Sequence, residues 1–332
     1  MQQLIYIISI ILASSVSTYA QSDFDLSQRW FNESVYNPAA TGNSFTTSIF
    51  LHARKQWIGL DGAPITGVVS GDVYLENIQS AVGFSISGDK IGFTKTYNVR
   101  AAYAYYIPIG ERSAISMGLS ASLFHRNRNF DGVIMEPDDP QVLLNNKSEY
   151  APDFDIGVEY QGLFKLGFAI RHLLDVNSSD DDAWPTHSRN FWAYASTRFN
   201  ASYNLSLEPS VSYAYRDKIN RTEAGMLFYF LRSDPNRSYN DKFWLGAIYR
   251  FNSQFSLLIG TQITPQLRIG YSYDHGLGDL GGLSKWGTHE IMIGWQFNRI
   301  FYKESQDCPA YRSRSYSSPG KKSKPDLHNR FY

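Results

Sequence analysis

The feature that most constrains the fold is a period-two alternation between residues 266 and 297. Large apolar or aromatic residues alternate there with small or polar ones, on both sides of a Gly-rich loop. A period of two predicts β-strands with one apolar and one polar face. Because the polar face is rich in Gly and Ser and the apolar face in aromatics, we interpret the strands as facing lipid outside and a protein lumen inside. The apolar set is Leu267, Ile269, Tyr271, Tyr273, Ile291, Ile293, Trp295 and Phe297.

The same pattern recurs from Phe45 onward and predicts an all-β chain, a transmembrane antiparallel β-barrel of about 14 strands. Each candidate strand is close to the ~9–11 residues that a tilted strand needs to cross a bilayer. Twelve or sixteen strands stay open as alternatives, because 231–241 is long where a short turn is expected and 250–253 is short where a long loop is expected. The candidates are about 45–56, 66–75, 80–88, 95–107, 113–125, 150–160, 163–172, 190–199, 203–215, 220–230, 242–251, 254–264, 266–274 and 288–298.

The connections between these strands alternate in length. Three of them, 126–149, 173–189 and 275–287, are long and rich in Asp, Asn, Gly and Ser, whereas the intervening turns are short. Short turns on one side and long loops on the other are typical of bacterial outer-membrane barrels. We therefore expect short periplasmic turns, long extracellular loops and both termini in the periplasm of a Gram-negative bacterium.

The polar faces of the strands would bring charges of both signs into one lumen. Comparable numbers of acids and bases favour mutual pairing over a pore lined by one sign, so we expect a rather occluded barrel. The residues concerned are His52, Arg54, Asp72, Arg100, Asp155, Glu159, Lys165, Arg171, Glu208, Glu223, Arg268 and Glu290.

The two ends of the chain differ from the barrel. Residues 1–20 resemble a secretory signal peptide, with an apolar run and a small-x-small site before Gln21, and the run is too short to span a membrane. Residues 21–44 form a polar leader, which we expect outside the barrel in the periplasm. The barrel would occupy 45–298. Residues 299–332 form a basic tail that is either flexible or a periplasmic handle for a partner.

Composition and motifs offer little chemistry. The 31 basic and 31 acidic residues balance, which gives no reason to expect a nucleic-acid partner, and Cys308 alone can form neither an intramolecular disulfide nor a Cys-based zinc site. The seven histidines occur singly, and no nucleophile elbow or metalloprotease motif is present. The acidic stretches 136–139 and 180–182 could bind calcium, although such loops are more often simply solvated. We expect no catalytic residue, no cofactor and no metal.

Eight short strings occur in one order between Asp23 and Asn298. They are Tyr36-Asn37-Pro38-Ala39 with Gly42; His52 with Arg54-Lys55-Gln56-Trp57; Asp61-Gly62-Ala63-Pro64 with Thr66; Asp89-Lys90-Ile91-Gly92; Tyr103-Ala104-Tyr105; Trp244-Leu245-Gly246 with Tyr249-Arg250; Tyr271-Ser272-Tyr273-Asp274; and His289-Glu290-Ile291. Together they resemble the PorP/SprF family of type IX secretion system outer-membrane proteins.

The resemblance implies a non-enzymatic outer-membrane barrel that works with the secretion and gliding machinery. Its partners would be a secreted adhesin or the C-terminal domain of another type IX substrate, periplasmic ring subunits of the machine and outer-membrane lipid, with no nucleic acid. Its extracellular loops would assist export or surface anchoring of the adhesin. A partner-binding rim is expected at the motif positions; the alternative is that these positions only build a tight hairpin and the closing strands. The rim residues are Arg54, Gln56, Trp57, Asp61, Pro64, Tyr271, Tyr273, Asp274, His289 and Glu290.

Two other functions stay open on the sequence alone. A passive outer-membrane channel for small solutes would use the same fold and predicts ion conductance. A surface phospholipase or acyltransferase would need a Ser, a His and an orienting polar group at the lipid boundary, and no sequence motif indicates such a group of residues.

Overall fold

The computed structural model describes residues 24–110, 113–129, 147–174, 188–216, 219–234, 237–264, 266–282 and 284–297. The expected signal peptide, the basic tail with Cys308 and the acidic stretches 136–139 and 180–182 lie outside these residues. Strands dominate, in the order β1 Thr47–Lys55, β2 Ile65–Leu75, β3 Ser80–Ile91, β4 Thr94–Gly110, β5 Ser113–Arg128, β6 Lys147–Gln161, β7 Lys165–Arg171, β8 Asn190–Ser196, β9 Phe199–Ser202, β10 Leu205–Arg216, β11 Ile219–Asp234, β12 Arg237–Arg250, β13 Gln254–Gln262, β14 Leu267–Gly276 and β15 Thr288–Phe297.

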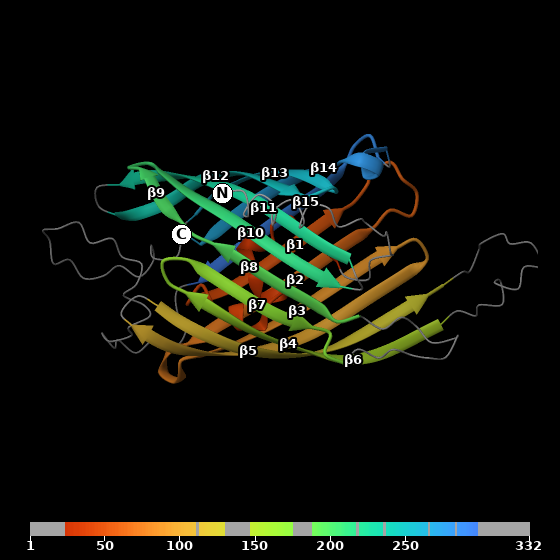
Figure 1. The fold of residues 1–332 in the computed structure, drawn as a ribbon, viewed down its shortest axis with the longest axis horizontal. Coiled ribbons are helices and arrows are strands. Elements are labelled where there is room, and N and C mark those ends of the chain that lie inside the picture. The colour runs from red at the N-terminus through yellow and green to blue at the C-terminus, as the bar shows by residue number, and fades with distance from the viewer. Residues whose placement is uncertain are drawn as a thin grey trace, which may run out of the picture.

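The strands close into one antiparallel barrel (Figure 1). Each strand pairs with its neighbours, and β15 pairs with β1 from Thr47↔Phe297 to Lys55↔His289, which closes the ring. Both β8 and β9 pair with β10, so they are two parts of one wall strand, and the 15 segments make 14 strands. The predicted 14-stranded barrel is confirmed.

Pairing also explains the two connections that broke the expected alternation. β11 and β12 stay paired as far as Asp234↔Arg237, so most of 231–241 is a long hairpin and not a loop. The β12–β13 connection is a short turn, closed by a hydrogen bond from the Ser253 amide to the Arg250 carbonyl. The count of 12 or 16 strands is therefore excluded, because neither connection adds or removes a strand.

Alternate residues face lipid and lumen as the period predicts. Outward side chains such as Val99, Met117 and Ile259 are more than half exposed, whereas inward ones such as His52 and Glu159 are fully buried. All twelve charged or His positions expected in the lumen are buried or half-buried. A closed barrel in lipid needs an apolar outer surface and leaves the polar side chains only the interior.

The barrel has two distinct ends. We call the end with the connections after β1, β3, β5, β7, β10, β12 and β14 the long-loop end; it carries a short helix, η6 Gly278–Gly282. The other, the short-turn end, carries the connections after β2, with η4 Glu76–Ile78, and after β4, β6, β9, β11 and β13. No helix in the described part of the chain is long and apolar enough to cross a membrane.

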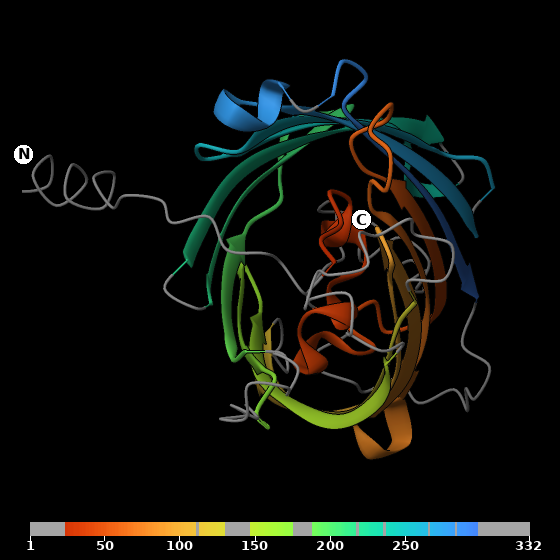
Figure 2. The ribbon, with the colours of Figure 1, turned by 90° about the vertical axis from the view of Figure 1, so that its right-hand side faces the viewer.

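Residues 24–46 lie inside the barrel, and we call them the plug. Figure 2, which looks along the barrel, shows this red segment within the ring of strands. It contains three short helices, η1 Arg29–Phe31, η2 Glu33–Val35 and η3 Pro38–Ala40. Leu26, Gln28 and Asn37 are completely buried. The expectation that the leader lies outside the barrel is wrong, because a polar segment can be buried where the lumen offers polar partners.

Candidate functional site: the plugged lumen

The plug crosses the lumen from one end to the other. Asp25 pairs with Arg250, the last residue of β12, at the long-loop end. Phe45 packs against Tyr74 and Tyr106 at the short-turn end, with ring centroids 4.8 and 5.3 Å away. The described chain therefore starts near the long-loop end and leaves β15 at the short-turn end. The expectation of both termini on one side concerns residues outside the described part.

A buried ion cluster anchors the plug near the long-loop end. Arg29 pairs with Glu223 of β11 and approaches Asp25 at 3.5 Å. Asp25 also pairs with Arg250 and, at 3.2 Å, with Arg221, while the Arg250 Nε donates to Glu223 at 2.6 Å. Burial alone would raise the pKa of Asp25, but the neighbouring guanidinium groups hold that pKa below its usual range. Two plug residues are thus bound by three wall residues of two strands.

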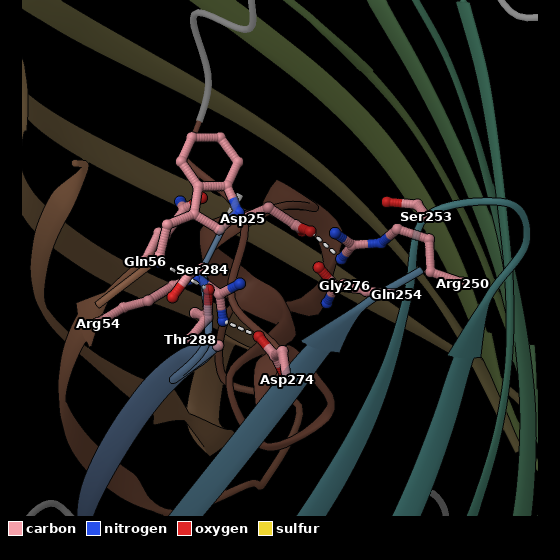
Figure 3. Close-up of a pocket in the computed structure, with 12 residues that line it drawn as sticks. Asp25, Arg54, Gln56, Arg250, Ser253, Gln254, Asp274, Gly276, Ser284 and Thr288 are labelled. Atoms are coloured by element: carbon pink, nitrogen blue, oxygen red, sulfur yellow. Dashed lines mark hydrogen bonds and ion pairs between the residues drawn. The ribbon is translucent and has the colours of Figure 1, made fainter. Parts of the chain in front are cut away.

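A second cluster ties the plug backbone to β1, β14 and β15. The Arg54 Nη1 lies 2.6 Å from the Asp274 carboxylate and 3.1 Å from that of Glu290. The amides of Ser27 and Gln28 donate to Glu290 at 2.8 and 3.1 Å, and the Ser27 hydroxyl donates to Asp274 at 2.8 Å. Figure 3 shows the Arg54–Asp274 and Asp25–Arg250 pairs side by side. These three wall residues were expected on a partner-binding rim, yet they are buried against the plug.

His52 extends this cluster toward the middle of the lumen. The Asn32 amide nitrogen lies 3.3 Å from the His52 Nε2 and donates to the Ser70 hydroxyl at 2.8 Å. The His52 Nδ1 lies 3.4 Å from Glu290. Because Nε2 faces a donor, we assign the ring proton to Nδ1, on the side of the carboxylate.

Toward the short-turn end a lysine and an arginine hold the middle of the plug. The Lys165 Nζ donates to both oxygens of Glu33, at 2.9 and 2.7 Å. Burial raises the pKa of Glu33 to about 7 although the ammonium opposes the shift. The Arg100 Nη1 donates to the carbonyls of Ser34 and Val35 at 2.7 and 3.1 Å. The plug helix η2 is therefore fixed by two charged groups of the wall.

Glycines of the wall form the seat of η3. A Cβ added at Gly118 would overlap the backbone of Ala39, and one added at Gly157 would overlap the Asn37 side chain. Asn37 caps η3 by accepting from the Ala39 amide at 2.9 Å and donates to the Val158 carbonyl at 3.3 Å. The family-like string at 36–39 thus lies directly against the wall at Gly118 and Gly157.

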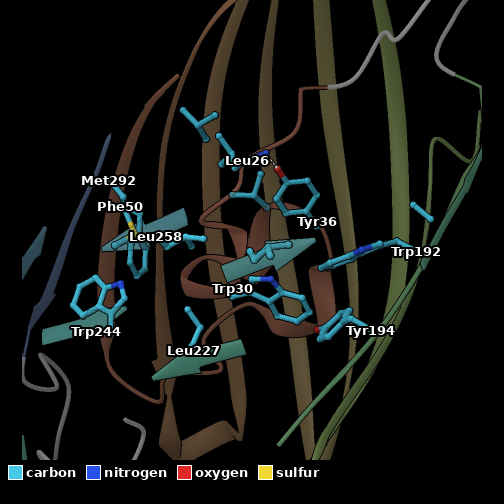
Figure 4. Close-up of a cluster of buried hydrophobic side chains, with 14 of the residues drawn as sticks. Leu26, Trp30, Tyr36, Phe50, Trp192, Tyr194, Leu227, Trp244, Leu258 and Met292 are labelled. Carbon is cyan, nitrogen blue, oxygen red and sulfur yellow. Dashed lines mark hydrogen bonds between the residues drawn. The ribbon is translucent and has the colours of Figure 1, made fainter. Parts of the chain in front are cut away.

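Aromatic rings fill the space between plug and wall (Figure 4). Trp30 meets Tyr194 edge to face at 6.3 Å, and Tyr36 meets Trp192 at 5.3 Å. Burial of such rings supplies apolar contact area that polar pairs do not. The buried cluster contains Leu26, Trp30, Val35, Tyr36, Phe50, Val68, Trp192, Tyr194, Ala214, Leu227, Tyr229, Trp244, Ile248, Leu258 and Met292.

A cavity of about 50 Å³ remains where the plug reaches the long-loop end. Its lining includes Gln56 and Trp57 together with the ion pairs Asp25–Arg250 and Arg54–Asp274 (Figure 3). This polar space has room for a few water molecules, at roughly 10–15 Å³ of such volume each.

The remaining expected rim residues lie in two separate places. Asp61 is exposed in the β1–β2 connection, where the buried Pro64 carbonyl accepts from the Gln56 amide at 2.9 Å. Tyr271 and His289 lie on the outer face of the barrel, where the Tyr271 hydroxyl is 2.6 Å from the His289 Nδ1. Tyr273 packs on the same imidazole at 5.3 Å. The ten residues therefore do not form one site.

Sequence reasoning missed the plug residues themselves. Asp25, Arg29 and Glu33 recur every four residues in the leader, and the string at 36–39 follows them. A solvated linker has no need of such a motif, so this combination was the available signal for a buried segment.

One group in the described residues has the composition of a cation site. Oxygen or nitrogen atoms of Asp153, Asp155 and His172 lie within 4.8 Å of one another. However, Asp155 already accepts from the His172 amide at 3.1 Å and from Ser120 at 2.8 Å, and pairs with Arg100 at 3.1 Å. The arrangement is that of a hydrogen-bond network supporting the wall.

Solved structures with similar folds are outer-membrane barrels. The toluene transporter TbuX from Ralstonia pickettii matches with a TM-score of 0.50 and 11% identity, over 80% of this chain and 92% of that one. A FadL homologue from Pseudomonas aeruginosa matches with a TM-score of 0.41 and 12% identity, over 80% of this chain and 94% of that one. At 11% identity the likeness to TbuX shows the fold alone.

Family membership comes from a different comparison. No curated protein matches the chain. The family model described as type IX secretion system membrane protein PorP/SprF matches residues 18–295, which include the plug and nearly the whole barrel. The chain therefore belongs to the PorP/SprF family of type IX secretion system membrane proteins.

Proposed function

We propose that this outer-membrane protein is a non-enzymatic component that assists export or surface anchoring of a large secreted protein, with the long-loop end outside the cell and the short turns in the periplasm. The observation that carries the proposal is the plug. A lumen filled by the protein's own residues leaves the two ends and the outer wall as working surfaces. The partners would be an adhesin or the C-terminal domain of another substrate on one side and ring subunits on the other.

The same observation argues against a passive diffusion channel. Buried ion pairs hold Asp25, Arg29 and Glu33 across the lumen, and the cavity beside Asp25 at the long-loop end is only about 50 Å³. Ion conduction needs a continuous hydrated path, which the plug obstructs. In a planar bilayer we expect the intact protein to be electrically silent, and steady conductance would favour the channel.

The test of the proposal is a mild-detergent pull-down of the tagged protein from outer membranes, followed by mass spectrometry. We expect a large secreted surface protein or type IX subunits to copurify. Trp286, 66% exposed at the long-loop end, and Leu163, 82% exposed at the short-turn end, allow a matched pair of variants. Trp286→Ala should reduce recovery of the surface protein, and Leu163→Ala should reduce recovery of periplasmic subunits. Recovery of the barrel alone, while other complexes stay intact, would contradict the proposal.

One contact favours a second candidate, acyl transfer on membrane lipid. The His125 Nε2 lies 2.9 Å from the Ser148 hydroxyl on the outer face. His125 also stacks between Tyr97 and Tyr150, with centroids 6.2 and 4.4 Å away. A Ser–His pair at the lipid boundary is the start of a nucleophilic site, but a triad also needs a group that orients the base. Hydrolysis of phospholipid by the wild type and its loss in Ser148→Ala would support this candidate.

A further inference from the structure

Three lysines lie on the outward face of the wall near the long-loop end. In the β3–β4 register Lys90 stands directly opposite Lys95. Across β2 the same row continues from Lys90 to Ile65 and from Ile65 to Lys55. All three lysines are exposed.

Within the part of the wall that the structure describes, this row of lysines has no paired counter-charge. Like charges directly opposite each other on neighbouring strands are destabilising. Asp89, next to Lys90 in the chain, points into the lumen and accepts from the Thr66 hydroxyl at 2.5 Å. Among the described residues no ion pair joins any of the three lysines to a carboxylate, and Asp61 is an exposed acid of the neighbouring turn. The outward positions of β1 to β4 carry no carboxylate: they are Thr47, Ile49, Leu51, Ala53, Lys55, Ile65, Gly67, Val69, Gly71, Val73, Leu75, Ser80, Val82, Phe84, Ile86, Gly88, Lys90, Lys95, Tyr97, Val99, Ala101, Tyr103, Tyr105, Ile107 and Ile109.

The lysine row borders the lipid-facing surface. Ile86, Tyr97 and Val99 lie one or two outward positions from Lys90 and Lys95 toward the short-turn end, and each is about half exposed. A lysine at such a border lays its aliphatic stem on apolar surface and extends its ammonium group to the headgroup layer. The row is therefore continuous with the surface that the barrel presents to lipid.

We propose that Lys55, Lys90 and Lys95 form a docking site for the phosphate of an anionic lipid headgroup in the leaflet at the long-loop end. An ammonium group is a compact charge with three donors, so a phosphate between Lys90 and Lys95 would neutralise the facing pair. The lipid chains would lie against the apolar positions of β3 and β4. This inference is independent of the export partner, because it concerns the outer wall and not the loops.

The experiment uses the full-length protein in mixed micelles and native mass spectrometry. The probes are phosphatidylglycerol, with a net anionic headgroup, and phosphatidylcholine, whose headgroup carries no net charge. We expect the wild type to retain more phosphatidylglycerol, and the double variant Lys90→Gln/Lys95→Gln to retain at least about five-fold less, from the roughly five-fold gain expected per lysine near a charged headgroup layer. Lys285→Gln, an exposed lysine of the β14–β15 connection, is the matched control and should leave retention unchanged.

Three outcomes would overturn the site. Equal retention by the wild type and the double variant would show that these lysines bind no headgroup. An equal loss in Lys285→Gln would show that only overall charge matters. Equal retention of phosphatidylglycerol and phosphatidylcholine by the wild type would show that the site does not select an anionic headgroup. Since glutamine keeps a polar side chain at exposed positions, we expect both variants to fold, which unchanged electrophoretic heat-modifiability would verify.

Discussion

The two halves of the plug are held by different physics. Near the long-loop end, Asp25 and Arg29 are fixed almost entirely by ion pairs with β11 and β12. Near the short-turn end, Asn37 and Ala39 sit against glycines, and Phe45 packs among tyrosines. Ion pairs depend on charge state, whereas close packing depends on shape. The comparison indicates that the long-loop half can be released by a change of charge, whereas the segment from Asn37 to Phe45 is sensitive to a change of volume.

The largest expected effect comes from removing the shared carboxylate of the long-loop half. Glu223→Ala leaves three guanidinium groups around Asp25, and breaking a buried pair in this way costs about 3–5 kcal/mol. We expect the Arg29 peptide bond to become cleavable by trypsin and conductance to appear in planar bilayers. Asp61→Ala removes an exposed carboxylate and serves as control. Unchanged protection of Arg29 would show that the ion cluster does not hold the plug.

The next effect is a pH dependence at Glu33. Its pKa rises from 4.5 to about 7 on burial, so the folded state binds more protons than the unfolded state between these values. The free energy of unfolding should therefore fall as pH rises from about 4.5 to 7, by up to roughly 3 kcal/mol at about 1.4 kcal/mol per unit. Urea unfolding at several pH values measures it. Glu33→Gln should remove this fall, and an equal slope in the variant would contradict the assignment.

Asp25 should respond in the opposite direction. Because its pKa is depressed in the folded protein, its contribution is present above its ordinary value and is lost as pH falls below it. Acid should therefore expose the Arg29 bond to an acid-active protease before the barrel unfolds. If the plug became accessible to the protease only at the pH at which the barrel unfolds, acid would not release the long-loop half of the plug separately.

A volume change tests the other half. Gly118→Val forces a side chain into the Ala39 backbone, and overpacking of this kind costs about 1–3 kcal/mol. We expect a lower thermal midpoint with Arg29 still protected, because the ion cluster is untouched. Gly67→Val, at an outward position with no heavy atom within 4 Å of an added Cβ, should leave the midpoint nearly unchanged. Cleavage at Arg29 in Gly118→Val would mean that the plug moves as one unit.

The smallest effect is expected from a single hydrogen bond. The Tyr106 hydroxyl donates to the Thr41 carbonyl at 2.7 Å. Tyr106→Phe keeps the ring and leaves a buried carbonyl without this donor, which costs about 1–2 kcal/mol. Tyr103→Phe, whose hydroxyl contacts the Ser80 hydroxyl at 2.8 Å on the outer side, is the matched comparison and should cost less. An equal loss of unfolding free energy in both variants would mean that burial of the Thr41 carbonyl does not increase the cost of removing its donor.

The barrel wall was predictable from the sequence because its cause is local. Lipid outside and a protein lumen inside impose a period of two on every strand, and that period identified all 14 strands within a few residues of their ends. The largest error in length concerned β11 and β12, whose paired extension to Asp234↔Arg237 lies where polar residues suggested a loop. Where a strand extends beyond the lipid, neither of its faces needs apolar residues, so the sequence shows no alternation from which the extension could be predicted.

The site was less predictable because its cause is not local. Arg54, Asp274 and Glu290 were predicted to belong to a partner-binding rim, whereas the structure buries them against the plug. Ser27 and Asp274 are 247 residues apart, and no spacing rule connects them. Arg54, Asp274 and Glu290 lie on β1, β14 and β15, and these strands become neighbours around the plug only when β15 pairs with β1 and closes the barrel.

The sequence by itself determined the class of fold and which face of each strand meets lipid, since both follow from hydrophobic alternation along a strand. Strand pairing then selected 14 strands from the alternatives of 12 and 16. The tertiary structure decided that the leader enters the lumen. A short polar segment carries no alternation of apolar and polar residues, and whether it is solvated or buried depends on the partners it meets. Those partners, Glu223, Glu290 and Lys165, belong to distant strands and face one interior only after the barrel has closed.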